Sequence, residues 1–491
     1  MKKSQKIILA VIISIGLFTT IYFTNPFHLP NSSNFVLGIM VLMLILWFSE
    51  TLPIGLVALI PLVIFPVMNL IPIDEAALFY IDKIIFLFFG GFVLGLSIEK
   101  WNLHKRLALG IVKITGTSPN KIILGFTIAV GFLSMWLSNT ATTMMMFPIA
   151  SSVIALVELN YKGSGKIKNF NLVLMLVIAY ASSIGGFATI IGTPPNVVTR
   201  GLLKDNFNYD MDFLDWSILA FPLSFILLAL TYIILTYIMF PNRMDKNSIP
   251  PSLINDEYKK LGKMSRQEWI VALVFIQTCM LWIFRPQIAA QLKLWGLDWG
   301  SDKYYIDFKF DDTFIAMIGA IMLFLIPADT NRYRPVFELK DLKKMQWGIL
   351  LLFGGGLCLA KAMEISGLMN IIGDYGARLG GGNELGMVII LTVIAVFVTE
   401  VMSNVALVTV FAPVAGGIAI GMKADPLLFI IPVTIGASCA FMSPIGTPPN
   451  AIVYASKKIK LYQMAKAGFV LNIVSSVLIC IFCYFFIDVI F

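Results

Sequence analysis

Long runs of apolar residues follow one another along the whole chain, separated by short polar segments. Residues 7–23, 54–70, 172–190 and 467–491 are four examples. Several runs contain about 20 residues, which is enough for an α-helix to cross the hydrocarbon core of a bilayer. The pattern therefore predicts an all-α polytopic membrane protein.

Two of the apolar regions, residues 121–158 and 385–421, are broken near the centre by polar residues. The first break is a Ser-Asn-Thr motif that begins at Ser138, and the second is a Ser-Asn motif that begins at Ser403. We interpret each region as a re-entrant hairpin, which enters and leaves the membrane on one side. The remaining segments then give about eleven transmembrane helices. The alternative is that these regions form additional spans or one long bent span.

The composition supports a membrane location. Of the 491 residues, 58% are hydrophobic and 13% are charged, and the mean hydropathy is +0.87. A soluble protein of this size is far less apolar. The first apolar run follows a basic start, but no small-residue cleavage site follows Phe23, so we expect a retained span and not a signal peptide.

The formal net charge of +8 comes from basic residues in short loops. Such loops lie preferentially on the cytoplasmic side, which explains the charge without a nucleic-acid partner. The connection from residue 285 to 312 carries five aspartates and is the best candidate for an external loop. Eleven spans then place the N-terminus in the cytoplasm and the C-terminus outside. The basic segments are residues 2–6, 103–113, 161–168, 243–266, 332–344 and 457–460.

The two halves of the chain repeat each other. The sequence Ile-Gly-Thr-Pro-Pro-Asn occurs at residues 191–196 and again at 445–450, and the two Ser-Asn motifs lie 265 residues apart, as do Glu99 and Glu364. Five predicted spans, an odd number, separate the two hairpins, so the repeats are inverted. The predicted organisation is a first span (1–34), a first repeat (35–240), a cytoplasmic linker (241–267) and a second repeat (268–491).

Each hairpin tip presents hydrogen-bonding groups near the middle of the membrane. Unpaired backbone groups at that depth are tolerated only where they line a cavity or bind something. The helix after each tip directs its N-terminus, with its partial positive charge, to this place, which favours an anion. Ser134 and Thr399, one turn before the tips, and the free carbonyl groups there offer hard oxygen ligands for a small cation.

The Gly-Thr-Pro-Pro sequences interrupt two further spans, because paired prolines remove two backbone donors and disfavour helix in the preceding residue. Broken helices at matching places in two halves point to a transport site. Neither these loops nor the tips contain Arg, Lys or His, and a dianion buried among neutral groups is costly. Bound sodium ions would supply the missing positive charge. For a single motif, a helix-joining hydrogen bond or a simple kink is the alternative; two ordered copies of both motifs favour a site.

Four other polar residues lie in or near apolar segments. Glu400, a carboxylate at membrane depth, is a functional candidate, and a structural hydrogen-bond partner is the alternative; Met135 occupies the matched place in the first repeat. Arg200 and Lys361 lie near span ends, where we expect their side chains to reach the interface. His104 lies near an interface. The chain shows no convergent nucleophile, base or metal-ligand set of the kind that an enzyme needs.

The paired Ser-Asn tips and paired Gly-Thr-Pro-Pro-Asn loops resemble the divalent anion:sodium symporter family of dicarboxylate and citrate transporters, over nearly the whole chain. The resemblance implies two opposed hairpins, a homodimer, and a transport domain that moves like an elevator against a scaffold. It implies a first sodium site formed by Ser134, Ser138, Asn139 and the Gly192 backbone, and a second formed by Thr399, Asn404 and the Gly446 backbone. The implied substrate-binding residues are Ser138, Asn139, Thr140, Ser403, Asn404, Val405, Thr193, Pro194, Thr447 and Pro448.

The second tip departs from the family pattern, because Val405 stands where the full motif has Thr. The implied function is secondary active transport of C4 and C5 dicarboxylates (the succinate, malate, fumarate and 2-oxoglutarate class) in the cell membrane. Sodium symport is favoured, and sodium-independent exchange is the alternative; citrate and sulfate are more remote substrates. A channel is disfavoured because it does not need a site closed by two opposed hairpins. No cofactor other than sodium ions is expected.

Overall fold

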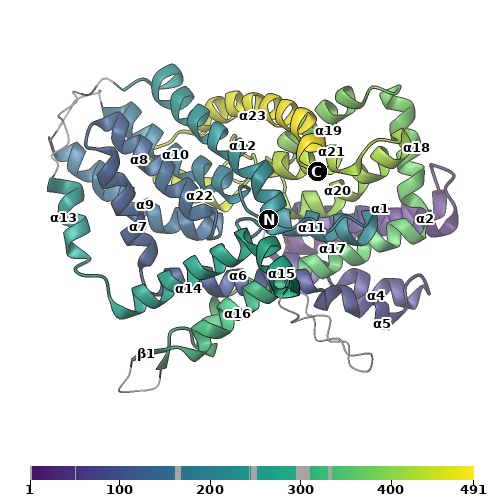
Figure 1. Ribbon diagram of the computed structural model, residues 1–491. Coiled ribbons are helices and arrows are strands. Elements are labelled where there is room, and N and C mark those ends of the chain that lie inside the picture. Colours follow the sequence, from purple (N-terminus) through teal and green to yellow (C-terminus); the bar gives the residue numbers. More distant parts are fainter. Residues whose placement is uncertain are drawn as a thin grey trace.

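The fold is almost entirely helical (Figure 1). The computed structural model describes residues 3–49, 51–160, 167–242, 244, 252–294, 310–329 and 334–491. Within these ranges, β1 (Pro327–Asp329) and β2 (Arg334–Pro335) form a short antiparallel ribbon. Parts of the expected basic loops and of the expected external loop, among them Asp298, Asp302 and Asp307, lie outside the described residues.

The number of apolar helices agrees with the predicted polytopic fold. Nine helices in the described ranges are long and apolar enough to cross a membrane, and up to eleven spans result if each bent helix pair counts as one. The helices of the first half are α1 (Lys3–Thr24), α2 (Asn31–Ser49), α3 (Ile54–Val57), α4 (Ile60–Val67), α5 (Ile73–Leu78), η1 (Phe79–Ile81), α6 (Lys83–Lys100), α7 (Leu103–Thr115), α8 (Pro119–Ser134), α9 (Asn139–Asn160), α10 (Lys168–Gly186), α11 (Pro194–Phe207), α12 (Phe213–Ile233) and η3 (Ile234–Met239). Those of the second half are α13 (Ser252–Lys260), α14 (Arg266–Ile283), α15 (Arg285–Leu294), α16 (Asp312–Leu325), η4 (Leu339–Lys344), α17 (Trp347–Ile365), α18 (Leu368–Gly380), α19 (Glu384–Val398), α20 (Asn404–Met422), α21 (Pro426–Ala437), α22 (Pro448–Tyr454) and α23 (Leu461–Ile490).

The order of helices recurs in the two halves. In the first half, α6 and α7 are followed by the pair α8–α9 and then by α10–α11; in the second, α17 and α18 are followed by α19–α20 and then by α21–α22. α7 and α18 each contain 13 residues and follow a residue in the left-handed conformation, Asn102 and Gly367. Each predicted hairpin is therefore two helices joined at its Ser-Asn motif. The inversion of the repeats and the re-entry of each hairpin stay predictions.

Helices α10 and α21, the first parts of the two interrupted spans, are buried along nearly their whole length. Small residues allow this close packing, because they let two backbones approach. A Cβ on Gly185 of α10 would lie 2.2 Å from the carbonyl oxygen of Gly131 in α8. A buried hydrogen bond joins the halves, since the hydroxyls of Thr199 in α11 and Thr434 in α21 lie 2.5 Å apart.

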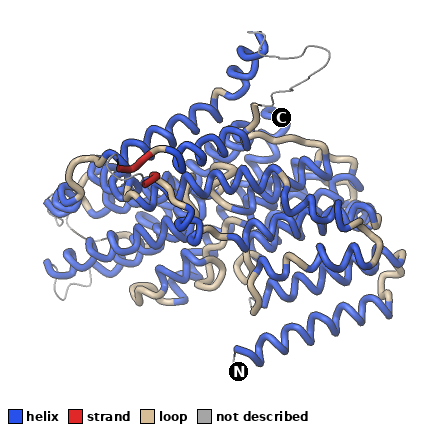
Figure 2. Tube along the Cα trace, turned by 90° about the horizontal axis from the view of Figure 1, so that it is seen from below, coloured by secondary structure: helices blue, strands red, loops and turns tan. Residues whose placement is uncertain are grey.

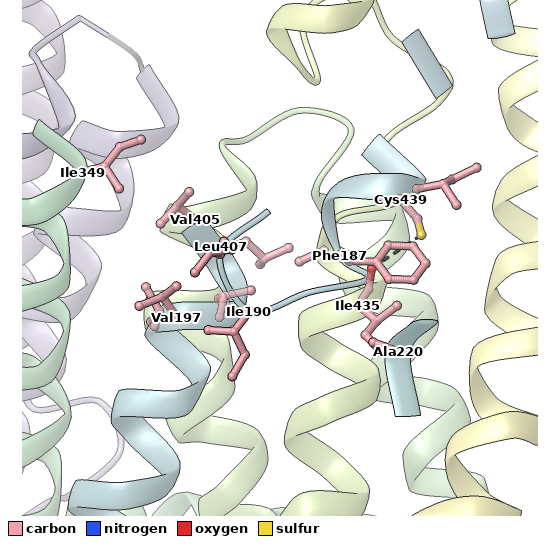
Figure 3. Packing of buried hydrophobic residues seen from close by; sticks show 14 of the residues in the cluster. Phe187, Ile190, Val197, Ala220, Ile349, Val405, Leu407, Ile435 and Cys439 are labelled. Atoms are coloured by element: carbon pink, nitrogen blue, oxygen red, sulfur yellow. Dashed lines mark hydrogen bonds between the residues drawn. The ribbon is translucent and has the colours of Figure 1, made fainter. Parts of the chain in front are cut away.

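The core around the interrupted spans is apolar. Figure 3 shows part of it, in which Phe187 and Ile190 of the first interruption, Ile435 of α21 and Val405 of α20 belong to one cluster of buried residues. Val405 is 8% exposed. A valine side chain suits this environment, whereas the hydroxyl of a threonine would need a hydrogen-bond partner.

The periphery of the bundle presents large apolar side chains. α1 packs against α2 and lies at the edge of the molecule, as Figure 2 shows. Its Ile8 and Ile12 are 58% and 61% exposed. Such a surface is unfavourable in water and suits lipid chains, as expected for a membrane protein.

Candidate functional site

The first tip is the short break between α8 and α9. The hydroxyl of Ser134 donates a hydrogen bond to Asn139 Oδ1 at 2.8 Å. The hydroxyl oxygen of Ser138 accepts one from the backbone N–H of Ala141 at 3.3 Å, so Ser138 caps α9. Ser134 is fully buried, and Ser138, Asn139 and the neighbouring Thr140 are half-buried. The tip therefore places hydroxyl and amide oxygens at the positive end of a helix.

The second tip, between α19 and α20, repeats this arrangement. The hydroxyl of Thr399 lies 2.8 Å from Asn404 Oδ1 and 2.6 Å from the carbonyl oxygen of Ala437, and it donates to one of these acceptors. The five-residue spacing from hydroxyl to asparagine is the same as in the first tip. Ser403 stands at the N-cap of α20. The contact between hydroxyl and asparagine is thus repeated, whereas Ser403, unlike Ser138, makes no side-chain hydrogen bond to the start of its helix.

The first interrupted span unwinds between Gly186 and Pro194, as predicted, and it lies against the first tip. The hydroxyl of Thr189 donates to the carbonyl oxygen of Met135 at 2.5 Å. A Cβ on Gly192 would lie 2.4 Å from the carbonyl oxygen of Gly186 and 3.0 Å from that of Ser134. Gly192 is therefore needed for the close approach of this loop to the tip.

The second interrupted span unwinds between Ala437 and Pro448. Its approach to the tip is looser, since a Cβ on Gly446 would lie 3.1 Å from the carbonyl oxygen of Glu400. The carboxylate of Glu400 accepts hydrogen bonds from the backbone N–H groups of residues 441, 442 and 443 and from Asn472 Nδ2, at 2.7 to 2.9 Å. In the structure Glu400 is thus a hydrogen-bond partner that holds the unwound segment, which was the structural alternative for this residue.

The asparagine that ends each Gly-Thr-Pro-Pro-Asn motif has a role that sequence reasoning did not assign. Asn196 Nδ2 donates to the carbonyl oxygens of Phe187 and Thr189 at 3.2 and 2.7 Å. Asn450 Nδ2 donates to those of Ala440 and Ser443 at 3.0 and 2.9 Å. Each asparagine satisfies carbonyl groups that the interrupted helix leaves unpaired. The presence of this asparagine in both copies of the motif was the sequence signal that could have revealed the role.

A cavity of about 380 Å3 lies beside the first tip. Ser138 and Thr140 of the tip and Gly192 and Pro194 of the interrupted span line it. Thr193 is buried behind these residues, 3% exposed. Of the first repeat's predicted residues, Ser138, Thr140, Gly192 and Pro194 therefore line the cavity, whereas Ser134, Asn139 and Thr193 are not among its lining residues.

The second repeat's predicted residues do not line this cavity. Ser403 and Asn404 are half-buried, Thr447 is buried and Pro448 is exposed. Val405, whose side chain belongs to the apolar cluster, lies outside the cavity as well. The two halves of the predicted site are therefore unequal in this conformation.

The oxygen atoms at both tips are suitable ligands for a small hard cation, although the groups that carry them are neutral. Across the described residues, no group of three or more His, Cys, Asp or Glu side chains is placed to hold a metal ion. Hydroxyl, amide and backbone carbonyl oxygens surround the two breaks instead, and unwound segments with such carbonyl groups are a recurring way to coordinate sodium in transporters.

The expectation that Arg200 reaches the interface is wrong. Its side chain is 3% exposed, and its guanidinium lies 3.0 Å from the carboxylate of Asp312, which is 1% exposed. Asp312 is also within 3.6 Å of Arg285 and accepts a hydrogen bond from the N–H of Phe213. The pair joins α11 to α16. A buried charge needs such a partner, and this partner lies too far away in the sequence to be predicted.

His104, at the start of α7, is 3% exposed. Its Nδ1 lies 3.1 Å from the carbonyl oxygen of Ile98, which only accepts hydrogen bonds, so Nδ1 carries the proton. Burial disfavours the charged imidazolium and lowers the pKa of His104 to about 4. The side chain is therefore neutral at physiological pH and serves packing.

A family model for the sodium:sulfate symporter transmembrane region matches residues 2–491. The chain belongs to this family. It is 38% identical over 470 residues to the sodium-dependent dicarboxylate transporter SdcS of Staphylococcus saprophyticus, across 95% of this chain and 88% of the relative. It is 37% identical over 473 residues to SdcS of Staphylococcus aureus strain USA300, with the same coverage. The resemblance noted in the sequence is confirmed, and the family is one of transporters and not of enzymes.

Two solved transporter structures share the fold. The YdaH transporter of Alcanivorax borkumensis matches with a TM-score of 0.60 and 14% identity, over 93% of this chain and 99% of that one. MtrF of Neisseria gonorrhoeae matches with a TM-score of 0.52 and 14% identity, over 92% and 95%. At this identity the likeness concerns the fold alone, and it confirms the predicted class of all-α polytopic membrane protein.

Proposed function

We propose that this chain is a secondary active transporter that carries C4 and C5 dicarboxylates across the cell membrane together with sodium ions. The similarity to relatives named sodium-dependent dicarboxylate transporters carries the proposal, at 37 to 38% identity over 95% of this chain. No other substrate class has comparable support, although the family description names sulfate.

The electrostatics of the tips support sodium coupling. A dicarboxylate at the first tip would meet hydroxyl groups, amides and a helix N-terminus, and none of these carries a full positive charge. Two sodium ions, one near Ser134, Asn139 and Gly192 and one near Thr399, Asn404 and Gly446, would supply that charge. Binding of the anion and of the cations then becomes mutually dependent, because each lowers the cost of burying the other.

The tips also support an elongated substrate. Each tip offers an asparagine, a serine and a helix N-terminus, so two carboxylates at the ends of one short carbon chain suit two tips that face each other. In this proposal Ser138, Asn139 and Thr140 bind one carboxylate, and Ser403 and Asn404 bind the other. Val405 adds no hydrogen bond, which makes the second half the less polar side of the pocket. Residues Thr193, Pro194, Thr447 and Pro448 close the pocket from the interrupted spans.

The inequality of the two halves supports alternating access. Gly91 and Met144 both line the cavity beside the first tip. The residues 265 positions later are Gly356 and Thr409, and a Cβ on Gly356 would lie 2.7 Å from Thr409 Cγ2. In the first repeat these two positions therefore line a cavity, whereas in the second repeat the matched residues pack against each other. We propose that an elevator-like movement of the hairpins and interrupted spans exchanges these two arrangements.

The orientation follows from the basic segments. The cavity reaches Lys344 at the end of η4, in one of the segments that the charge pattern assigns to the cytoplasm. We therefore propose that the cavity opens to the cytoplasm, with the N-terminus inside and the C-terminus outside. The homodimer implied by the family resemblance completes the proposal.

The test is uptake of radiolabelled succinate into liposomes that contain the purified protein. One set of liposomes is empty and has an inward sodium gradient; the other has no sodium gradient and contains unlabelled dicarboxylate. Sodium-driven accumulation in empty liposomes is the expected result. Uptake only into dicarboxylate-loaded liposomes, independent of sodium, would replace symport by exchange, and no uptake in both would refute the substrate class.

A further inference from the structure

The cavity beside the first tip has two charged side chains at its mouth, which the proposed site does not use. Among the described residues that line it, Lys344 carries the one positive charge and Glu99 the one negative charge. Lys344 Nζ and Glu99 Oε1 are 3.8 Å apart. Their side chains are 64% and 33% exposed, so both groups lie where the cavity meets solvent, whereas Ser138 is half-buried.

The charge of Lys344 is less compensated than that of its neighbours. Lys100 and Lys340 each have a carboxylate oxygen within hydrogen-bond distance, at 2.7 Å and 2.8 Å. The distance from Lys344 to Glu99 exceeds that of a hydrogen bond. The Lys344 side chain is 64% exposed, so it can turn toward an incoming anion at little cost.

The position of Lys344 at the mouth is fixed by its own segment. Lys100, the last residue of α6, pairs with Asp341 of η4, and Trp101 Nε1 donates to the carbonyl oxygen of Val336 at 2.9 Å. These contacts hold η4 against the end of the helix that forms one wall of the cavity. These contacts therefore fix where the Lys344 side chain begins, beside the end of α6.

The same pair of residue types recurs in the second repeat. Glu364 is the counterpart of Glu99, and its carboxylate lies 3.2 Å from Lys361 Nζ. Lys361 occupies the place of Leu96, which lines the cavity in the first repeat. The second lysine–glutamate pair, however, is a contact within one helix, α17, and the residue 265 positions before Lys344 is Phe79, so the repeat matches the two glutamates and not the lysines.

We propose that Lys344 is a guiding residue that draws dicarboxylate anions into the cavity and sets their apparent affinity from the cytoplasmic side, with Glu99 limiting this attraction. The inference rests on the proposed transport function. Lys344 does not bind the substrate in its final position. It raises the local concentration of a dianion in a cleft with low-dielectric walls, where the field of one charge is concentrated.

The test compares variants in inside-out membrane vesicles, where the cytoplasmic face is accessible. At low ionic strength, Lys344→Gln should raise the KM for succinate about three- to tenfold with an unchanged maximal rate. The effect should shrink toward none at about 0.5 M salt, because the Debye length then falls to about 4 Å and the charge of Lys344 is screened from an approaching anion. Lys344→Arg should restore the wild-type KM, and Glu99→Gln should lower it.

The matched control is Lys340→Gln. Lys340 lies in the same short helix, η4, and its side chain has a nearly equal exposed fraction, 63%. It pairs with Glu338, however, and is not among the residues that line the cavity. Its KM should equal that of the wild type. Equal KM values for Lys344→Gln and Lys340→Gln at low salt would refute the role of Lys344, as would a change confined to uptake from the external face of whole cells. Succinate transport by the wild type in the same vesicles tests the proposed function separately, and its absence would refute both.

Discussion

Alanine at Gly192 is the most informative single substitution at the site. Neither Gly192 nor Gly446 has a positive φ, so a methyl group tests packing and not backbone conformation. At Gly192 the new Cβ would lie 2.4 Å from the carbonyl oxygen of Gly186 and 3.0 Å from that of Ser134. At Gly446 the nearest atom would be a carbonyl oxygen at 3.1 Å. The two copies of one motif therefore predict different outcomes.

The magnitude follows from these distances. The carbonyl oxygens around Gly192 must retreat by about half an ångström or more, and overpacking of this kind costs about 1 to 3 kcal/mol. Displacement of that size also spoils ligand geometry, which must be held within about 0.5 Å. Because about 1.4 kcal/mol corresponds to a factor of ten in affinity, we expect sodium to bind about five- to 100-fold more weakly in Gly192→Ala. In Gly446→Ala the neighbours need to move by only a few tenths of an ångström, and we expect a change of threefold or less.

Sodium-dependent melting of the purified protein measures this effect directly, because a ligand stabilises the folded state that binds it. The sodium concentration that half-saturates the rise in melting temperature should increase strongly for Gly192→Ala and little for Gly446→Ala. Gly16→Ala is the control, since a Cβ there meets no atom within 4 Å. If Gly192→Ala and the wild type show the same sodium dependence, the loop around Gly192 is not part of an ion site.

Three further predictions concern other parts of the structure. Asn139→Ala and Asn404→Ala should each abolish succinate uptake while the protein still extracts and purifies as a folded species, because each removes the amide oxygen at a tip; full uptake in both variants would exclude the proposed site. Arg200→Met should destabilise the protein by about 3 kcal/mol, because it removes the nearest positive charge from the buried carboxylate of Asp312 and leaves only the more distant Arg285. Adding Asp312→Asn should recover part of the loss in thermal melting, and a stable single variant would contradict the pairing. His104 is neutral when folded, with a pKa of about 4, and titrates near 6.5 when unfolded, so protonation opposes folding by about 2 kcal/mol at pH 5 and by almost nothing above pH 7. Melting temperatures at pH 7.5 and 5 should differ less in His104→Gln than in the wild type, and equal differences would contradict the assignment.

Hydropathy and backbone chemistry are local properties of the chain. The sequence alone therefore determined the features that depend on them, namely the spans and their interruptions. The apolar runs gave the spans, and the paired prolines and the Ser-Asn motifs gave the interruptions at residues 187–193 and 135–138. Repetition of the two motifs in the same order then gave the matching halves. Each of these follows from a few neighbouring residues or from a comparison of the sequence with itself, so no long-range contact was needed.

Only the tertiary structure decided which distant groups meet. The carboxylate of Glu400 holds N–H groups 41 to 43 residues later, and Arg200 is paired with Asp312 although its position near a span end suggested the interface. Hydropathy gives the depth of a residue in the membrane but not the helix face that it shares with a partner. The face depends on how helices separated by many residues pack. That packing also placed Val405 in an apolar cluster and formed the cavity beside the first tip.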